Sequence, residues 1–289
     1  MNPEDRQLKP HSQARYLLCS DLDRTLIPNG PQAESPGARE TLRKLVDHHA
    51  VCVVFVTGRN RELVEEAVAA FDLPWPDAVI GDVGTRIWST FDRRWTLWSQ
   101  WDDLIRRDWT DAIHHQVQEQ ADRLEALQRQ SENRQTAYKL SYFCHAERLD
   151  TTARLLRQRL ASARLPARVI ASLDETTEQG LIDVLPELAS KRSAIEMVMG
   201  AWGFPHWATV CAGDSGNDLP FLTSALQAVL VGNATDLVRQ QALAMACTQG
   251  QADNLYLARG GLLGMNGNYA AGVLEGFAHY VPEARDWLN

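Results

Sequence analysis

Residues 21–25 read Asp21-Leu22-Asp23-Arg24-Thr25, and they follow an apolar run, residues 16–19, that predicts a buried β-strand. Side chains at alternate strand positions share one face of a sheet, so Asp21 and Asp23 are expected to point into the same space. In open α/β sheets, ligands bind in this space beyond the carboxyl ends of the strands. Two carboxylates at that place indicate a site that binds a cation.

An isolated Asp-x-Asp pair more often marks a strand that ends in a turn with solvated acids, so the interpretation depends on the segments that follow. Residues 51–56 form a second apolar run, which ends in Thr57-Gly58-Arg59. The Thr57 hydroxyl group and the neighbouring backbone amides are suited to holding a phosphoryl oxygen. Lys191 follows another strand-like run, residues 181–186, and offers a positive charge to the same group.

A fourth segment repeats the pattern of the first. Residues 209–212 predict a strand, and Gly213-Asp214-Ser215-Gly216-Asn217-Asp218 follows it directly. Asp214 and Asp218 are therefore expected at the carboxyl end of a strand in the same sheet. Along the chain, the order is an acid pair, a threonine, a lysine and a second acid pair.

That order resembles the haloacid dehalogenase (HAD) superfamily of phosphatases, whose motifs are DxDxT, a strand-end Ser or Thr, a Lys, and GDxxND. Within the superfamily, the chain is similar to the sucrose-phosphate phosphatase branch. The similar segments are residues 18–23 (LCSDLD), 83–88 (VGTRIW), 138–143 (YKLSYF), 183–186 (DVLP), 211–218 (CAGDSGND), 231–234 (VGNA) and 270–276 (AAGVLEG). The chain departs from the branch at Arg24, where Asn or Gly is usual, and at Ser190-Lys191-Arg192, where Gly-Lys-Gly is more common. These departures bear on the substrate more than on the chemistry.

The predicted fold class is α/β, a Rossmann-like parallel-sheet core with an inserted α+β cap domain. Short apolar strands alternate with helical stretches over residues 16–88, which is typical of a parallel sheet flanked by helices, and the pattern returns after residue 186. The segment between them differs in character, and the resemblance places a cap between the second and third motifs. We therefore predict a polar tail at 1–15, a catalytic core at 16–88 and 187–289, and a cap at 89–186.

The resemblance also implies a role for each core residue. Asp21 attacks phosphorus to give an aspartyl-phosphate, which water then hydrolyses. Asp23 donates a proton to the leaving sugar oxygen and later, as the carboxylate, activates the attacking water. Thr57, the Gly58 amide and Lys191 hold the phosphoryl oxygens.

The expected cofactor is Mg²⁺. Two anions repel at contact, so Asp21 approaches a phosphate only if a cation lies between them. The resemblance implies that Asp21, the backbone carbonyl of Asp23 and Asp214 bind the ion with phosphate and water, while Asp218 orients a bound water. Asn217 is expected to position Asp218 or to contact the substrate.

The cap is expected to recognise the sugar. Lys139 is the cap residue expected to bind substrate, and Ser141 and Arg86 are weaker candidates to face the cleft. Tryptophans gather near the start of the cap, and indole rings stack on sugar rings, although large aromatics more often fill a core. These residues are Trp88, Trp95, Trp98, Trp101 and Trp109. Packing is the preferred interpretation for each of them singly, and only their clustering indicates a saccharide.

Composition narrows the functional class. The chain has 289 residues, 45% hydrophobic and 23% charged, which fits an ordinary globular protein of more than one domain. Its formal net charge of -8, without a basic stripe, argues against nucleic-acid binding. Five cysteines without paired spacing predict a reduced, cytoplasmic protein. No signal peptide and no membrane-spanning run is expected, since residues 1–15 are polar and no apolar run approaches about 18 residues.

The leading functional hypothesis is a Mg²⁺-dependent phosphatase that acts on a phosphorylated disaccharide such as sucrose 6-phosphate. The alternatives are a phosphatase for another glycosyl phosphate, such as mannosylfructose phosphate or a glycosyl-glycerate phosphate, a sugar phosphomutase, and a non-catalytic phosphosugar-binding partner of a glycosyltransferase. A binding module has no use for Asp23, which argues against the last alternative. An association with the glycosyltransferase that makes the substrate is also expected.

Overall fold

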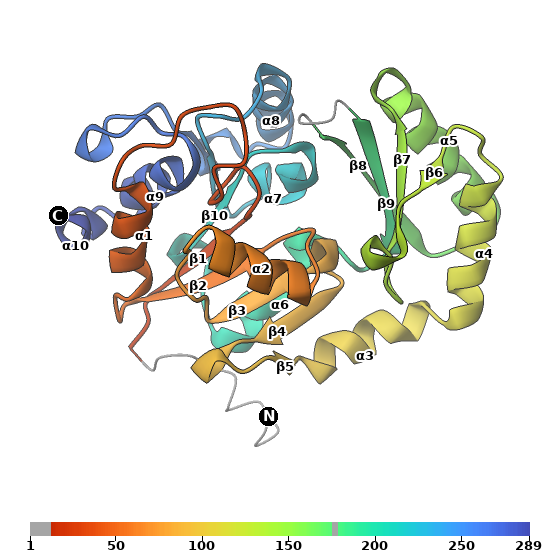
Figure 1. The fold of residues 1–289 in the computed structure, drawn as a ribbon, viewed down its shortest axis with the longest axis horizontal. Coiled ribbons are helices and arrows are strands. Elements are labelled where there is room, and N and C mark those ends of the chain that lie inside the picture. Colours follow the sequence, from red (N-terminus) through yellow and green to blue (C-terminus); the bar gives the residue numbers. More distant parts are fainter. Residues whose placement is uncertain (1–12, 175–178) are drawn as a thin grey trace.

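The computed structural model describes residues 13–174 and 179–289. It contains an eight-stranded sheet with helices on both faces and, beside it, a four-stranded antiparallel sheet with helices of its own (Figure 1). The predicted α/β class with a Rossmann-like parallel-sheet core is confirmed. Most of the predicted polar tail, residues 1–15, lies outside the described residues.

The large sheet has the strand order β12-β11-β10-β1-β2-β3-β4-β5. Its strands are β1 (Tyr16–Ser20), β2 (Val51–Val56), β3 (Ala78–Gly81), β4 (Arg86–Ser89), β5 (Thr96–Leu97), β10 (Thr209–Gly213), β11 (Gln227–Leu230) and β12 (Leu255–Leu257). Neighbouring strands from β12 to β3 are parallel, whereas β4 and β5 are antiparallel to their neighbours. Because β1 lies between β10 and β2, the segments after these three strands meet at one edge of the sheet.

Both faces of the large sheet are covered, which explains why its central strands are apolar throughout. Alternate residues of β2 face opposite sides: Cys52, Val54 and Val56 on one, Val51, Val53 and Phe55 on the other. The second side packs on helices α1 (Ala38–Val46), α2 (Arg61–Ala70), α9 (Tyr269–Tyr280) and α10 (Ala284–Leu288). The first packs on α6 (Lys191–Trp202), α7 (Leu219–Leu222) and α8 (Asp236–Thr248).

The small sheet has the strand order β6-β7-β9-β8. Its strands are β6 (Gln128–Arg129), β7 (Leu140–His145), β8 (Ala167–Asp174) and β9 (Gln179–Pro186), and helices α4 (Asp111–Asp122) and α5 (Leu149–Ser162) accompany it. Helix α3 (Ser99–Asp108) connects the large sheet to this part of the chain (Figure 1). The whole small sheet falls within the predicted cap, although β5 of that segment pairs with the large sheet, so the domain boundaries stay a prediction.

A single buried apolar cluster runs from one face of the large sheet into the small sheet. Its members include Val54 of β2, Leu140 of β7, and Trp98 and Trp101. The two sheets are therefore held together by packing as well as by the polar contacts described below. Among the helices of the described residues, none has the length and apolar character that crossing a bilayer requires.

Candidate active site

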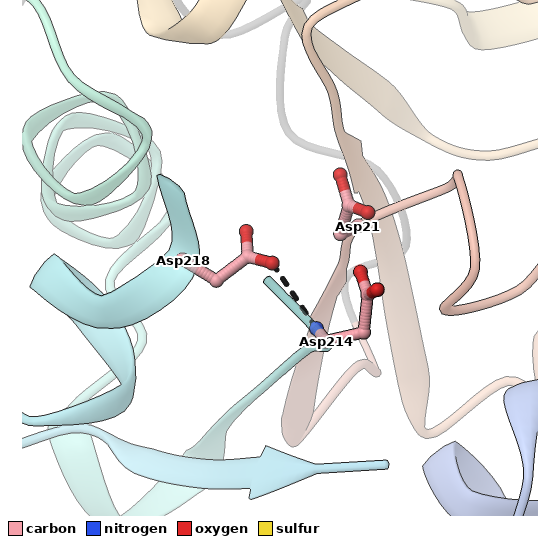
Figure 2. Close-up of side chains that lie close together, drawn as sticks. All are labelled: Asp21, Asp214 and Asp218. Atoms are coloured by element: carbon pink, nitrogen blue, oxygen red, sulfur yellow. Dashed lines mark hydrogen bonds between the residues drawn. The ribbon is translucent and has the colours of Figure 1, made fainter. Parts of the chain in front are cut away.

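Three carboxylates converge at the edge of the large sheet where β1 and β10 end (Figure 2). Asp21 follows β1, while Asp214 and Asp218 follow β10, and carboxylate oxygens of the three lie within 4.8 Å of one another. The residues are 4%, 2% and 0% exposed, respectively. The two predicted acid pairs thus meet at one point, except that the carboxylate of Asp23 is not part of the group.

Backbone hydrogen bonds fix this arrangement. The Asp21 N–H donates to the Ala212 carbonyl at 2.9 Å, which continues the pairing of β1 with β10 past the end of the strand. The backbone N–H of Asp214 donates to Asp218 Oδ2 at 3.1 Å (Figure 2), and the N–H of Ser215 donates to the same oxygen at 3.1 Å. One oxygen of Asp218 is therefore used by its own turn, and the other is directed at Lys191.

Lys191 connects the two acidic segments. Its Nζ donates to Asp21 Oδ1 at 2.6 Å, to Asp218 Oδ1 at 2.7 Å and to Asn217 Oδ1 at 2.9 Å, which uses the three donors of an ammonium group. The side chain is placed by the start of α6, where the Ser190 hydroxyl accepts from the Ser193 N–H at 3.0 Å. Burial would lower the pKa of Lys191, but the charges of Asp21 and Asp218 outweigh it, and the net shift is upward.

The group of acids is short of positive charge. Burial, followed by the neighbouring carboxylates of Asp218 and Asp214, raises the pKa of Asp21 well above its usual range. Burial and the charge of Asp218 raise the pKa of Asp214 to about 7. Arg24 Nε and the Thr25 hydroxyl, each donating at 3.2 Å, relieve Asp214 only in part. Three buried carboxylates that offer only oxygen ligands fit a hard divalent cation such as Mg²⁺.

Asp23 has a different environment from the other acids. Arg59 donates to both of its oxygens, through Nε at 2.8 Å and Nη2 at 2.6 Å, and Asn29 Nδ2 donates to Oδ1 at 2.8 Å. Burial would raise the pKa of Asp23, but the hydrogen bonds and charge of Arg59 prevail and hold it below its usual value. Arg59 therefore favours the ionised form of Asp23.

The segment after β2 lies beside the acids, one strand away. Thr57 is fully buried, and its Oγ1 accepts a hydrogen bond from the Arg59 N–H at 3.2 Å. The hydroxyl proton of Thr57 stays available to donate to an oxygen of a ligand. The Gly58 carbonyl accepts a hydrogen bond from Lys139 Nζ at 3.0 Å.

Lys139 is the predicted small-sheet residue that reaches this segment. Its Nζ also lies 3.1 Å from Asp82 Oδ1. Ser141, by contrast, donates to Asp183 at 2.5 Å within the small sheet. Arg86 pairs with Asp102 of α3. Of the three residues predicted to face the cleft, Lys139 is the one for which the described part of the chain shows a contact with the segment that carries Thr57.

Residues 14–281 match the family model described as sucrose-6F-phosphate phosphohydrolase. The chain belongs to this family. A relative, an uncharacterised HAD-like hydrolase of Nitrosococcus oceani, is 45% identical over 277 residues, which are 95% of this chain and 74% of that protein. The mannosylfructose-phosphate phosphatase of Agrobacterium fabrum is 28% identical over 225 residues, which are 75% of this chain and 83% of that protein.

A solved structure extends the comparison to the fold. The sucrose-phosphatase from Synechocystis, in complex with sucrose and phosphate, matches with a TM-score of 0.75 at 24% identity, over 93% of this chain and 98% of that chain. The likeness shows a shared fold. Together with membership of the sucrose-6F-phosphate phosphohydrolase family, it identifies the chain as a HAD-superfamily phosphatase, a phosphoric monoester hydrolase.

The tryptophans in this member of the family mostly serve packing. Trp98, Trp101 and Trp109 are at most 3% exposed and belong to the apolar cluster that joins the two sheets. Trp88 and Trp95 are partly buried and contact each other edge to face, with ring centroids 5.7 Å apart. Their clustering is therefore explained by the junction between the sheets.

Sequence reasoning missed several residues that shape the site. Arg59 and Asn29 hold Asp23, Arg24 binds Asp214, and Asp82 binds Lys139. Arg59 had a usable signal, because a cation two residues after Thr57 follows the same strand end. Asp82 likewise directly follows β3, but a single acid at a strand end is too common to single out.

Proposed function

We propose that this protein is a Mg²⁺-dependent phosphatase that hydrolyses a phosphorylated disaccharide, with sucrose 6-phosphate as the first candidate, through an aspartyl-phosphate on Asp21. The observation that carries the proposal is the position of Lys191, whose ammonium group binds Asp21 and Asp218 beside Asp214. The proposed nucleophile Asp21 and the Lys191 ammonium group thus share one buried site with the second acid pair, Asp214 and Asp218. Family membership supports a sugar phosphate, and the matched Synechocystis structure contains sucrose and phosphate.

The proposed chemistry divides a very slow hydrolysis into two steps. An oxygen of Asp21 attacks phosphorus and displaces the sugar oxygen, and water then attacks the aspartyl-phosphate and frees phosphate. Lys191, the Thr57 hydroxyl, the Gly58 N–H and Asn217 would hold the phosphoryl oxygens while charge moves between attacking and leaving groups. Asp23 would supply a proton to the sugar in the first step and remove one from water in the second.

Asp21, Asp214 and Asp218, with the backbone carbonyl of Asp23, would hold the metal. Mg²⁺ would offset the charge of the buried carboxylates and of the phosphoryl group, and so permit the two anions to meet. The raised pKa values of Asp21 and Asp214, caused first by burial and then by neighbouring carboxylates, support this part of the proposal, because a bound cation would favour the ionised forms.

Other glycosyl phosphates are alternative substrates. The Agrobacterium relative acts on mannosylfructose phosphate, so this ester is the main alternative substrate, followed by a glycosyl-glycerate phosphate. A phosphomutase or a non-catalytic binding partner has no specific support. Lys139 is a candidate substrate-binding residue.

We also propose a reducing, cytoplasmic location and an association with the glycosyltransferase that makes the phosphate ester. All five cysteines are free, and four of them are buried, which supports a reducing environment. Such a transferase produces the ester that this site would consume, so direct transfer between the two would save a diffusion step. Co-sedimentation of the two purified proteins tests the association.

A phosphate-release assay over a panel of sugar phosphates, with Mg²⁺, tests the function. We expect the highest kcat/KM for a disaccharide phosphate and no release by the Asp21→Asn variant. Release from monosaccharide phosphates in preference to every disaccharide would exclude the proposed substrate class. Conversion of a sugar phosphate into its isomer without free phosphate would identify a mutase instead.

A further inference from the structure

A buried charge pair links the small sheet to the large sheet beside the proposed phosphate site. Lys139 lies in the turn just before β7, where its backbone forms a bridge with Thr136. Its Nζ is 3.1 Å from Asp82 Oδ1, and the side chains of Lys139 and Asp82 are 6% and 4% exposed. A charge pair removed from water in this way is costly unless its geometry is well satisfied, so it is weak evidence for stability alone.

Asp82 lies in a strained loop. Asp82, Val83 and Gly84 have φ angles of 49°, 59° and 97°, which places three consecutive residues in the left-handed region. For a β-branched residue such as Val83, this conformation is a clear outlier. Strain of this kind persists where surrounding contacts determine it, and it concentrates at ligand clamps and active sites.

The contacts of this loop are with the segments proposed to hold phosphate. The Val83 N–H donates to the Thr57 carbonyl at 3.0 Å, and the Asp82 N–H donates to the Arg59 carbonyl at 2.9 Å. Gly84 packs so tightly on Ser190, next to Lys191, that an added Cβ would lie 2.2 Å from the Ser190 carbonyl oxygen. The loop that binds Lys139 therefore also supports the Thr57 backbone and the start of α6.

Lys139 is connected to the Thr57 hydroxyl group through one peptide plane. Its Nζ donates to the Gly58 carbonyl at 3.0 Å, and the N–H of the same peptide unit, that of Arg59, donates to Thr57 Oγ1 at 3.2 Å. The carbonyl and the N–H of a trans peptide point in opposite directions and rotate together. Fixing the Gly58 carbonyl from one side thus fixes the donor that orients the Thr57 hydroxyl on the other.

We propose that Lys139, held by Asp82, is a positioning residue for the Thr57 hydroxyl group, so that docking of the small sheet sets the geometry of the phosphate site. This inference rests on the proposed function and deepens it. It differs from a role in reading the sugar, because the Lys139 ammonium group is directed at the large sheet. Losing Lys139 then weakens the reaction of every phosphate ester, whatever its leaving group.

The double variant Lys139→Met/Asp82→Asn tests the proposal, because it removes both charges and leaves no unpaired buried ion. Asn also tolerates the left-handed conformation of residue 82. We expect kcat/KM to fall roughly tenfold to a hundredfold, the range for losing hydrogen bonds to a charged group, on a disaccharide phosphate and on p-nitrophenyl phosphate alike. A loss confined to the disaccharide phosphate would overturn the proposal in favour of a sugar contact.

A double-mutant cycle, in which the Lys139→Met/Asp82→Asn variant is combined with Thr57→Val, separates positioning of the Thr57 hydroxyl from general structural support. If Lys139 acts through the Thr57 hydroxyl, the double variant causes little further loss once that hydroxyl is absent. Losses that multiply in the Thr57→Val background would contradict the proposal. Arg134→Met, which removes an exposed cation from the same turn region, is the matched control and should keep wild-type kinetics. Should the double variant fail to fold, Asp82→Asn alone enters the same cycle, with the same criterion.

Calorimetric titration with inorganic phosphate, in the presence of Mg²⁺, supplies a readout that does not depend on turnover. The double variant should bind phosphate more weakly than the wild type, but no more weakly than Thr57→Val. Unchanged phosphate affinity in the double variant would overturn the positioning role. A wild-type protein that binds phosphate yet releases none from any ester would refute the proposed function and leave this inference to be judged by the titration.

Discussion

Arg59 binds both carboxylate oxygens of Asp23, at 2.8 and 2.6 Å, and so holds this acid apart from the buried group formed by Asp21, Asp214 and Asp218. The two neighbouring acids of the first motif consequently have opposite electrostatics. The pKa of Asp21 is raised, chiefly by burial, and that of Asp23 is lowered, because Arg59 outweighs the effect of burial. In this conformation Asp23 is suited to act as a base, and to act as an acid it must leave Arg59.

Replacing Arg59 tests this relationship. In Arg59→Gln the pKa of Asp23 should rise, so that the ionised base is lost at higher pH than in the wild type. The acidic limb of the pH dependence of phosphoenzyme hydrolysis should move upward, and kcat should fall by roughly tenfold because the carboxylate is less well oriented. Single-turnover measurements across pH check this. Arg59→Lys keeps the positive charge but loses the paired hydrogen bonds of the guanidinium group, so a smaller shift of the acidic limb is expected. An unchanged pH dependence in both variants would refute the role of Arg59 in setting the pKa of Asp23.

The Asp21→Asn and Asp23→Asn variants should lose activity at different steps of the reaction. Asp21→Asn removes the proposed nucleophile and should abolish phosphoenzyme formation. Asp23→Asn should slow both steps, and it should accumulate the phosphoenzyme when the leaving group needs little protonation, as with p-nitrophenyl phosphate. Rapid-quench labelling distinguishes the two. Stoichiometric labelling of Asp21→Asn would show that another residue is the nucleophile.

The meeting of the two acid pairs could be predicted from sequence because it depends only on strand order. Asp21 and Asp214 each directly follow an apolar strand, and parallel strands end at the same edge of a sheet. Lys191 could not be placed by this argument, because the strand before it, β9, belongs to the small antiparallel sheet. Strand order brings Asp21 and Asp214 together, whereas Lys191 is indicated by its place in the order of motifs that resembles the HAD superfamily.

The partners of individual side chains could not be predicted in this way. Arg59 follows a strand end, but whether Asp23 faces Arg59 or the other three carboxylates depends on a side-chain rotamer, which leaves no pattern in the sequence. The Asp82–Lys139 pair joins segments 57 positions apart, through a loop whose left-handed backbone is unusual for Val83.

Gly84 should be a sensitive position for stability. Its φ of 97° disfavours any L side chain, and a Cβ would lie 2.2 Å from the Ser190 carbonyl oxygen and 2.7 Å from the Lys191 backbone nitrogen. We expect Gly84→Ala to lower the free energy of unfolding by roughly 2–4 kcal/mol and to reduce activity by displacing Lys191. Denaturation in urea and phosphate-release kinetics check the two effects.

Gly200 provides the matched control for that substitution. It lies within α6, and nothing comes within 4 Å of a Cβ added there. Gly200→Ala should leave activity unchanged and raise stability by up to about 1 kcal/mol, because alanine favours the helix. If Gly84→Ala were as stable and active as Gly200→Ala, the tight contact with Ser190 would have no energetic consequence.

The metal-free protein should become less stable as pH rises towards neutrality. Because the pKa of Asp214 is raised to about 7 in the folded protein, the folded state binds more protons than the unfolded state between about pH 4 and about pH 7. Stability therefore falls as pH increases through this window, by an amount on the order of a few kcal/mol if Asp214 acts alone. If Mg²⁺ binds the ionised carboxylates as proposed, the stabilisation it provides should grow over the same range.

Thermal denaturation with EDTA and with Mg²⁺, at about pH 5 and about pH 7, measures both effects. Asp214→Asn removes the titrating group, and we expect it to flatten the pH dependence of the metal-free protein and to weaken stabilisation by Mg²⁺. Ca²⁺ should also raise the melting temperature yet support little turnover, because its larger and looser shell is unsuited to in-line attack by Asp21. Equal stabilisation of the wild type and Asp214→Asn by Mg²⁺ would place the ion elsewhere, and full turnover with Ca²⁺ would contradict the demand for a compact coordination shell.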